Sequence, residues 1–71
     1  MAVTNITLPA IITITNTSDK EIRFIPYREN FSVPVAAGDV YTLEATTSGQ
    51  VFYYLAQETE GLTVTQAPKA D

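Results

Sequence analysis

The chain has 71 residues, with eight acidic residues against four basic ones and neither cysteine nor histidine. A chain of this length is expected to form a single domain, and its composition excludes a disulfide framework and the usual zinc site. An acidic chain whose few basic residues are scattered is also unsuited to bind nucleic acid or an anionic membrane. Because so short a chain buries only about 60% of the surface that its unfolded form exposes, association is the remaining common way for it to gain stability.

Apolar and polar residues alternate with a period of two along most of the chain, as in strands with one buried face. The first such segment is interrupted at Pro9, which cannot donate to a strand ladder. We therefore expect an extended N-terminal arm over residues 1–9 that contacts another chain. Six short strands are then predicted, at residues 10–16, 21–26, 31–35, 40–45, 51–57 and 62–66.

Turn-forming residues separate these segments at intervals of roughly ten residues. The run Ala37-Gly38-Asp39 is typical of a tight hairpin, because glycine readily adopts a positive φ. Turns are also predicted at 16–19, 46–50 and 58–61, and a polar tail at 68–71. The pattern indicates an all-β fold, a small antiparallel β-sandwich or barrel of about six strands, with residues 10–67 as its single domain.

The apolar residues outnumber the places in one small core, most visibly in the segment Val51–Leu55, where odd and even positions are both apolar. The residues predicted to face inward are Ile12, Ile14, Ile22, Phe24, Val33, Val35, Leu43, Tyr53, Leu55, Leu62 and Val64. Those left without a place are Ile11, Ile25, Tyr27, Val40, Phe52 and Tyr54. Either these residues contact a partner, or a central strand buries both of its faces between two layers. For Phe52 the sequence favours the two alternatives equally.

We expect the partner interface to include tyrosines, whose hydroxyls tolerate a wet rim, and an arginine beside them, a common pairing at interfaces. Arg28 next to Tyr27 fits that pairing, although an ordinary surface arginine fits the sequence equally well. The residues predicted to contact a partner are Ile6, Leu8, Ile25, Tyr27, Arg28, Phe52 and Tyr54.

Residues that could carry chemistry are sparse. Nucleophilic catalysis would need a serine activated by Lys20, since histidine and cysteine are absent. A carboxylate pair could be drawn from Glu44, Glu58 and Glu60, but these residues read as a strand surface and a solvated turn. The stretch 58–61 has no calcium-loop pattern. The sequence therefore predicts no enzyme, no metal and no cofactor.

In residues 16–22, 36–43 and 53–55 the chain resembles small virion accessory proteins of tailed bacteriophages, including capsid decoration (cement) proteins. The resemblance implies a non-enzymatic, multi-copy structural protein located on the virion and assembled in the host cytoplasm. The implied partners are the major capsid protein or other virion subunits, copies of itself included. The alternative from the residues alone is a small monomeric protein- or carbohydrate-binding β module, acting as an inhibitor or adaptor.

Overall fold

A computed structural model describes residues 8–69, within which the chain forms five strands and one helix. The elements are β1 (Ala10–Asn16), β2 (Ile22–Phe24), β3 (Val33–Val35), β4 (Val40–Ala45), α1 (Ser48–Leu55) and β5 (Leu62–Pro68). They build a three-stranded sheet in the order β4-β1-β5 and a two-stranded sheet of β2 and β3, both antiparallel. The expected predominantly β, antiparallel architecture is confirmed, but the sheets do not close into a barrel.

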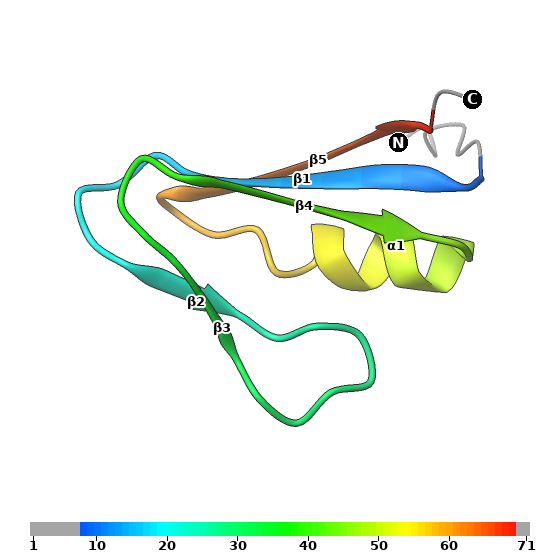
Figure 1. The fold of residues 1–71 in the computed structure, drawn as a ribbon, viewed down its shortest axis with the longest axis horizontal. Helices are drawn as coiled ribbons and strands as arrows, with labels where there is room; N and C mark the ends of the chain where they lie inside the picture. Colours follow the sequence, from blue (N-terminus) through cyan, green and yellow to red (C-terminus); the bar gives the residue numbers. More distant parts are fainter. Residues whose placement is uncertain (1–7, 70–71) are drawn as a thin grey trace.

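The three-stranded sheet forms one layer, and α1 and the β2–β3 sheet lie together against the same face of it (Figure 1). β1 alternates strictly, with its even-numbered residues buried on that inner face and its odd-numbered residues half-exposed on the outer face. Side chains from both sheets and from α1 meet in one core, as the expected inward positions Ile12, Phe24 and Leu62 confirm. The period-two pattern therefore predicted these core residues of the strands correctly.

The predicted fifth strand, residues 51–57, is wrong, because residues 51–55 belong to α1 and residues 56–57 form the turn that follows it. Thr47 caps the helix by accepting a hydrogen bond from the backbone N–H of Gln50. The Gln50 side chain in turn accepts one from the backbone N–H of Thr46, 2.6 Å away. Val51 and Tyr54, three residues apart, face the core. The second apolar face of the segment is thus one side of a helix. The predicted turn at 46–50 is also wrong, because α1 begins at Ser48.

The predicted hairpin at residues 37–39 is a tight turn but not a hairpin. Gly38 has a φ of 79°, and the Asp39 N–H donates to the carbonyl of Ala36. The strands on either side do not pair with each other, since β3 pairs with β2 and β4 pairs with β1. The turn therefore carries the chain from one sheet to the other.

Asn16, at the end of β1, is fully buried and joins the two sheets. Its side-chain amide donates to the carbonyl of Val35 in β3 at 2.8 Å and to that of Lys20 at 2.6 Å. Its side-chain oxygen accepts from the backbone N–H of Ser18 at 2.9 Å. A buried side chain with its polar atoms satisfied in this way fixes the turn after β1 against the second sheet.

The C-terminal boundary also differs from the expected one. β5 continues to Pro68, and the Lys69 N–H donates to the carbonyl of Pro9. The ladder with β1 therefore reaches beyond residue 67, the predicted end of the domain. Lys69 further forms an exposed ion pair with Glu44 at 3.3 Å. Most of the predicted N-terminal arm, residues 1–7, lies outside the described residues.

Candidate interaction surface

The loop between β2 and β3 is held against α1 by side chains of the helix and of the residues that follow it. The Tyr54 hydroxyl accepts a hydrogen bond from the backbone N–H of Tyr27 at 2.8 Å. The Gln57 amide brackets Ile25, accepting from its N–H at 2.9 Å and donating to its carbonyl at 2.8 Å. The Tyr53 hydroxyl lies 3.3 Å from the carbonyl of Pro26. These contacts fix an otherwise irregular loop in one place.

Tyr54 consequently lies in the core, with 6% of its surface exposed, which is incompatible with its expected place on an exposed aromatic face. Its ring stands edge-on to those of Phe24 and Tyr53, with centroids 6.4 Å and 5.2 Å away. The error follows from the strand assignment, because strand alternation pairs Tyr54 with Phe52, whereas a helix turns them to different sides. Phe52 is 51% exposed.

The structure brings three of the predicted interface residues together. Ile25, Tyr27 and Arg28 lie on the same loop, with Ile25 and Arg28 exposed and Tyr27 half-buried. Arg28 has a φ of 64°, and its guanidinium carbon lies 6.0 Å from the centre of the Tyr27 ring. Leu8, before β1, is 40% exposed. Ile6 lies outside the described residues.

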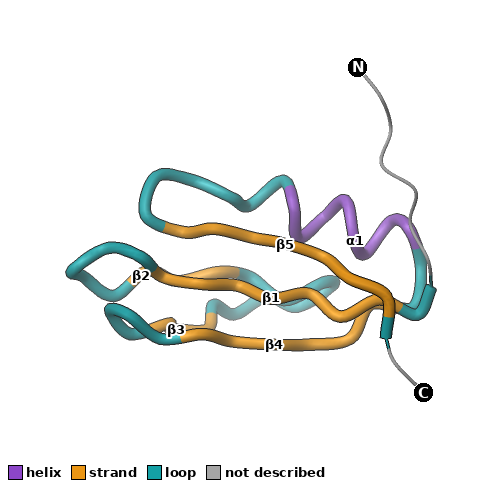
Figure 2. Tube along the Cα trace, turned by 90° about the horizontal axis from the view of Figure 1, so that it is seen from above, coloured by secondary structure: helices purple, strands orange, loops and turns teal. Residues whose placement is uncertain are grey.

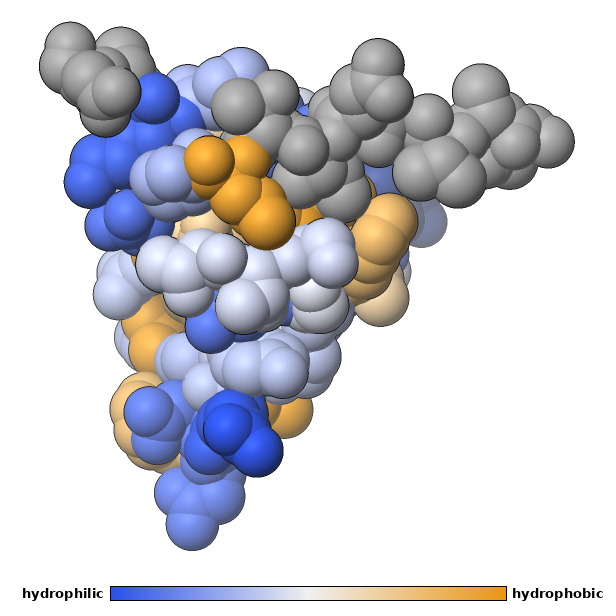
Figure 3. Space-filling view, turned by 90° about the vertical axis from the view of Figure 1, so that its right-hand side faces the viewer, coloured by the Kyte–Doolittle hydropathy of each residue, from blue (hydrophilic) through white to orange (hydrophobic). Residues whose placement is uncertain are grey.

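The apolar surface is divided among several places. Viewed from the side of α1's first turn, hydrophobic side chains form separate spots among hydrophilic and near-neutral ones (Figure 3). Val40 and Tyr41, at the start of β4, are 57% and 40% exposed. Tyr41 lies on the inner face of β4 and touches Phe24, with ring centroids 5.1 Å apart. It remains exposed because β4 is at the margin of the sheet (Figure 2).

The two margins of the three-stranded sheet differ in their backbone groups. The Thr17 N–H donates to Gly61 and the Lys69 N–H to Pro9, which shows that odd-numbered residues of β1 bond to β5. Even-numbered residues of β1 bond to β4, as Asn16 does to Asp39. In an antiparallel ladder the alternate residues of an edge strand point their N–H and C=O groups outward. Those residues are 62, 64, 66 and 68 in β5 and 40, 42 and 44 in β4.

The outward groups of β5 are occupied at its start, and its last outward position is a proline. Leu62 exchanges two backbone hydrogen bonds with Thr59. The Val64 N–H donates to the Glu58 carboxylate at 3.3 Å. Pro68 has no N–H to offer. Capping side chains and edge prolines are devices that keep a sheet margin from pairing with another chain.

The outward groups of β4 have no such covering among the described residues. Val40, Thr42 and Glu44 direct backbone N–H and C=O groups away from β1, and no hydrogen bond to another described residue satisfies them. β4 contains neither proline nor lysine. Only beyond its end is an outward N–H taken, that of Thr46 by Gln50. An edge of this kind is a template for a further strand.

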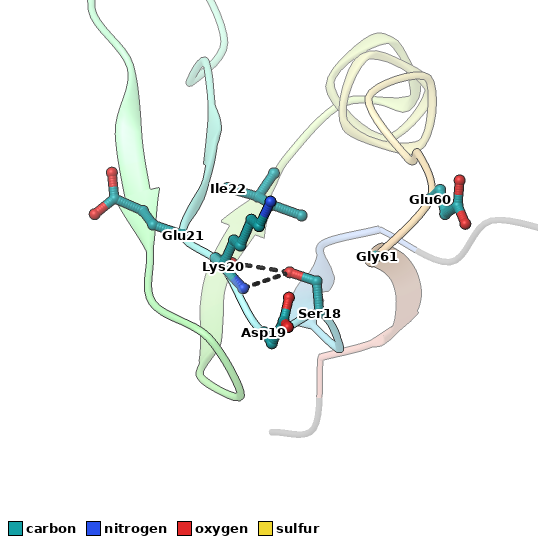
Figure 4. A pocket seen from close by; sticks show the side chains of 7 residues that line it. All are labelled: Ser18, Asp19, Lys20, Glu21, Ile22, Glu60 and Gly61. Carbon is teal, nitrogen blue, oxygen red and sulfur yellow. Dashed lines mark hydrogen bonds between the residues drawn. The ribbon is translucent and has the colours of Figure 1, made fainter.

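A surface hollow of about 520 Å³ lies where the turn after β1 meets the turn before β5. It is lined by Ser18, Asp19, Lys20, Glu21, Ile22, Glu60 and Gly61 (Figure 4). The Ser18 hydroxyl already contacts the carbonyl of Lys20 at 2.8 Å and the N–H of Lys20 at 3.2 Å. A Cβ on Gly61 would lie 2.9 Å from the Ser18 Cβ, so the two turns are in close contact. The approach of Gly61 to Ser18 keeps the two turns together.

Comparison with protein-family models, with curated proteins and with solved structures found no match for this chain. Over residues 8–69, no group of three or more acidic side chains is placed to hold a metal ion. In the same stretch no helix has the length and apolar character needed to span a membrane. The candidate site is therefore the set of exposed apolar side chains and the open edge of β4.

Proposed function

We propose that this chain is a non-enzymatic assembly protein that acts by binding other protein chains. One observation carries the proposal: within residues 8–69, large apolar side chains remain 40–57% exposed on a very small protein. They are Leu8, Ile25, Phe31, Val40, Tyr41 and Phe52. Scattered singly, such residues are ordinary. Here two of them adjoin an unsatisfied sheet edge, a combination that favours contact with another chain.

The rigidity of the loop that carries Ile25 and Tyr27 supports the same function. Gln57 and Tyr54 fix this loop before any partner arrives. Less conformational entropy is therefore lost when the loop is bound. A surface prepared in this way suits a protein that occupies one kind of site repeatedly.

The specific form of this proposal is a multi-copy protein of a virion, stabilising contacts between capsid subunits as a decoration or cement protein. Its basis is the resemblance in residues 16–22, 36–43 and 53–55, together with the exposed apolar side chains. The partners in that case are capsid subunits, neighbouring copies of the chain, or both.

Sedimentation of extracts from the cells that make the protein tests this function. After separation on a density gradient, the chain should be found in fast-sedimenting particles at a fixed ratio to another protein. Washing the particles at high salt should leave it bound, because the contacts are mainly apolar. If the chain stays at the top of the gradient and binds a soluble protein or a sugar as a monomer, it is a binding module instead.

A further inference from the structure

We propose that the open edge of β4 pairs antiparallel with β4 of a second copy of this chain. The pairing joins two three-stranded sheets into one six-stranded sheet across a twofold axis. The biological role of this dimer rests on the proposed assembly function, whereas the pairing itself is inferred from the backbone of β4. The partner proposed for the edge of β4 is therefore a second copy of the chain.

The outward-facing groups of β4 are self-complementary. They belong to Val40, Thr42 and Glu44, which are spaced evenly on either side of Thr42. When two such strands meet antiparallel about Thr42, Thr42 opposes Thr42 and Val40 opposes Glu44 of the second copy. Each opposing pair exchanges two backbone hydrogen bonds. The same edge on both copies therefore satisfies the hydrogen-bonding groups of the other, as a twofold interface requires.

The neighbouring register is disfavoured by a contact already present. Centring the pair on Leu43 would place Val40 opposite Thr46 of the second copy. The Thr46 N–H is occupied by the Gln50 side chain at 2.6 Å. Pairing about Thr42 leaves that contact intact and uses only β4 groups that have no partner among residues 8–69.

The side chains agree with this register. Tyr41 and Leu43 lie on the inner face of β4, and Tyr41 is 40% exposed. In the pair each Tyr41 faces Leu43 of the second copy at a position without backbone hydrogen bonds, where side chains approach most closely. The ring and the leucine cover each other, which removes exposed apolar surface from both copies.

The charges do not oppose the pairing. The only charged residue within β4 is Glu44, which forms an ion pair with Lys69 of its own chain at 3.3 Å. The two Glu44 residues would lie about four strand positions apart, roughly 13 Å at the rise of a β-strand. That separation exceeds the Debye length of about 8 Å at physiological salt.

The blunted edge of β5, occupied at residues 62 and 64 and ending in Pro68, sets the size of the assembly formed in this way. Glu58, Thr59 and Pro68 blunt that margin. Since β4 is used up in both copies, the paired sheet ends in two blunted edges. Strand pairing therefore stops at a dimer and does not continue into a fibre.

Sedimentation equilibrium of the full chain tests the pairing. The mass should rise from 7.8 kDa toward twice that value with concentration. Thr42→Lys places two like charges opposite each other at the axis and should weaken the dimer by about fivefold, the upper end of the effect of one cross-strand pair. Thr65→Lys makes the same change at an exposed position on the same face of β5 and should leave the dimer unchanged. A chain that stays monomeric up to about 1 mM contradicts the proposal.

Cysteine cross-linking provides a second test that does not depend on the charged variants. The natural chain has no cysteine, so Thr42→Cys gives one thiol per copy. Opposing residues of a hydrogen-bonded pair have Cα atoms about 5.5 Å apart, within the range of disulfides. Oxidised glutathione should link Thr42→Cys into a dimer much faster than Thr65→Cys. Equal rates for the two variants, or faster linking of Thr65→Cys, would overturn the proposal.

The two proposals fail in different ways. A chain that is monomeric by sedimentation and does not cross-link through position 42, yet travels with a large particle, disproves the β4 pairing and leaves the assembly function standing. A chain that dimerises through β4 but never joins a particle disproves the virion role and leaves the pairing standing.

Discussion

Asn16 offers a sharp test of how the two sheets are joined. Replacing it with aspartate retains the oxygen that accepts from Ser18 and exchanges only the amide nitrogen. That nitrogen donates to the carbonyls of Val35 and Lys20. In the variant an oxygen faces both carbonyls, so two acceptors lose their donor and a negative charge is buried. Each lost partner costs about 1–3 kcal/mol.

We therefore expect Asn16→Asp to lower the free energy of unfolding by at least about 3 kcal/mol. At about 0.05–0.15 kcal/mol per residue the whole chain is stable by only about 4–10 kcal/mol. Urea unfolding followed by circular dichroism measures the change. With a slope near 1 kcal/mol per M, typical of small proteins, the midpoint should fall by about 3 M.

The matched control is Asn30→Asp, which makes the same chemical change at an exposed loop position. It should alter the midpoint by less than about 0.5 M, the effect of an ordinary surface substitution. If the two variants unfold at the same urea concentration, the hydrogen bonds of the Asn16 amide do not hold the two sheets together.

Two further comparisons test the turns and the aromatic contact. Gly38→Ala and Gly61→Ala both place a side chain at positive φ, 79° and 87°, which costs about 1–2 kcal/mol. Only Gly61→Ala also meets another side chain at 2.9 Å, so in thermal unfolding it should be the more destabilised of the two, and equal melting temperatures would disprove the close contact. Tyr54→Phe removes the acceptor of the Tyr27 N–H and should cost about 1–2 kcal/mol in urea unfolding. Tyr41→Phe, an exposed phenol, should cost less than about 0.5 kcal/mol, and a larger loss there than at Tyr54 would contradict the assignment.

The strands of the central sheet could be predicted from the sequence because one face of each is buried. β1 shows this most clearly, with its even-numbered residues inside and Thr13 and Thr15 outside. Strand alternation depends only on local sequence, so it can be recognised without knowing which strands lie next to each other. Which strands pair depends on distant residues. β3 and β4 are separated by a tight turn and still belong to different sheets.

α1 was missed because its apolar run is made of residues that favour strands. Phenylalanine, tyrosine and valine fill positions 51–54, and the run is too short to display a helical period by itself. The available signal was at the start of the helix. Thr47 followed three residues later by Gln50 is a helix-capping pattern, and Val51, Tyr54 and Leu55 follow at helical spacing.

The candidate site was predicted only in part for a related reason. Ile25 and Tyr27 were identified because they had no place in a strand core, and Arg28 because it adjoins Tyr27. The structure places all three on one loop. The edge of β4 could not be identified, since a strand becomes an edge through its neighbours. Nothing in its own residues distinguishes it from a central strand.

Residue-resolved hydrogen exchange of the full chain at low and high protein concentration tests the central claim most directly. In dilute solution the backbone N–H groups of Thr42 and Glu44 should exchange rapidly, while those of Tyr41 and Leu43, bonded to β1, should be protected. At high concentration Thr42 and Glu44 should become protected, whereas Gln66, on the opposite margin, should not change. Equal exchange of Thr42 and Glu44 at both concentrations would contradict the claim that β4 is the surface through which this protein binds another copy.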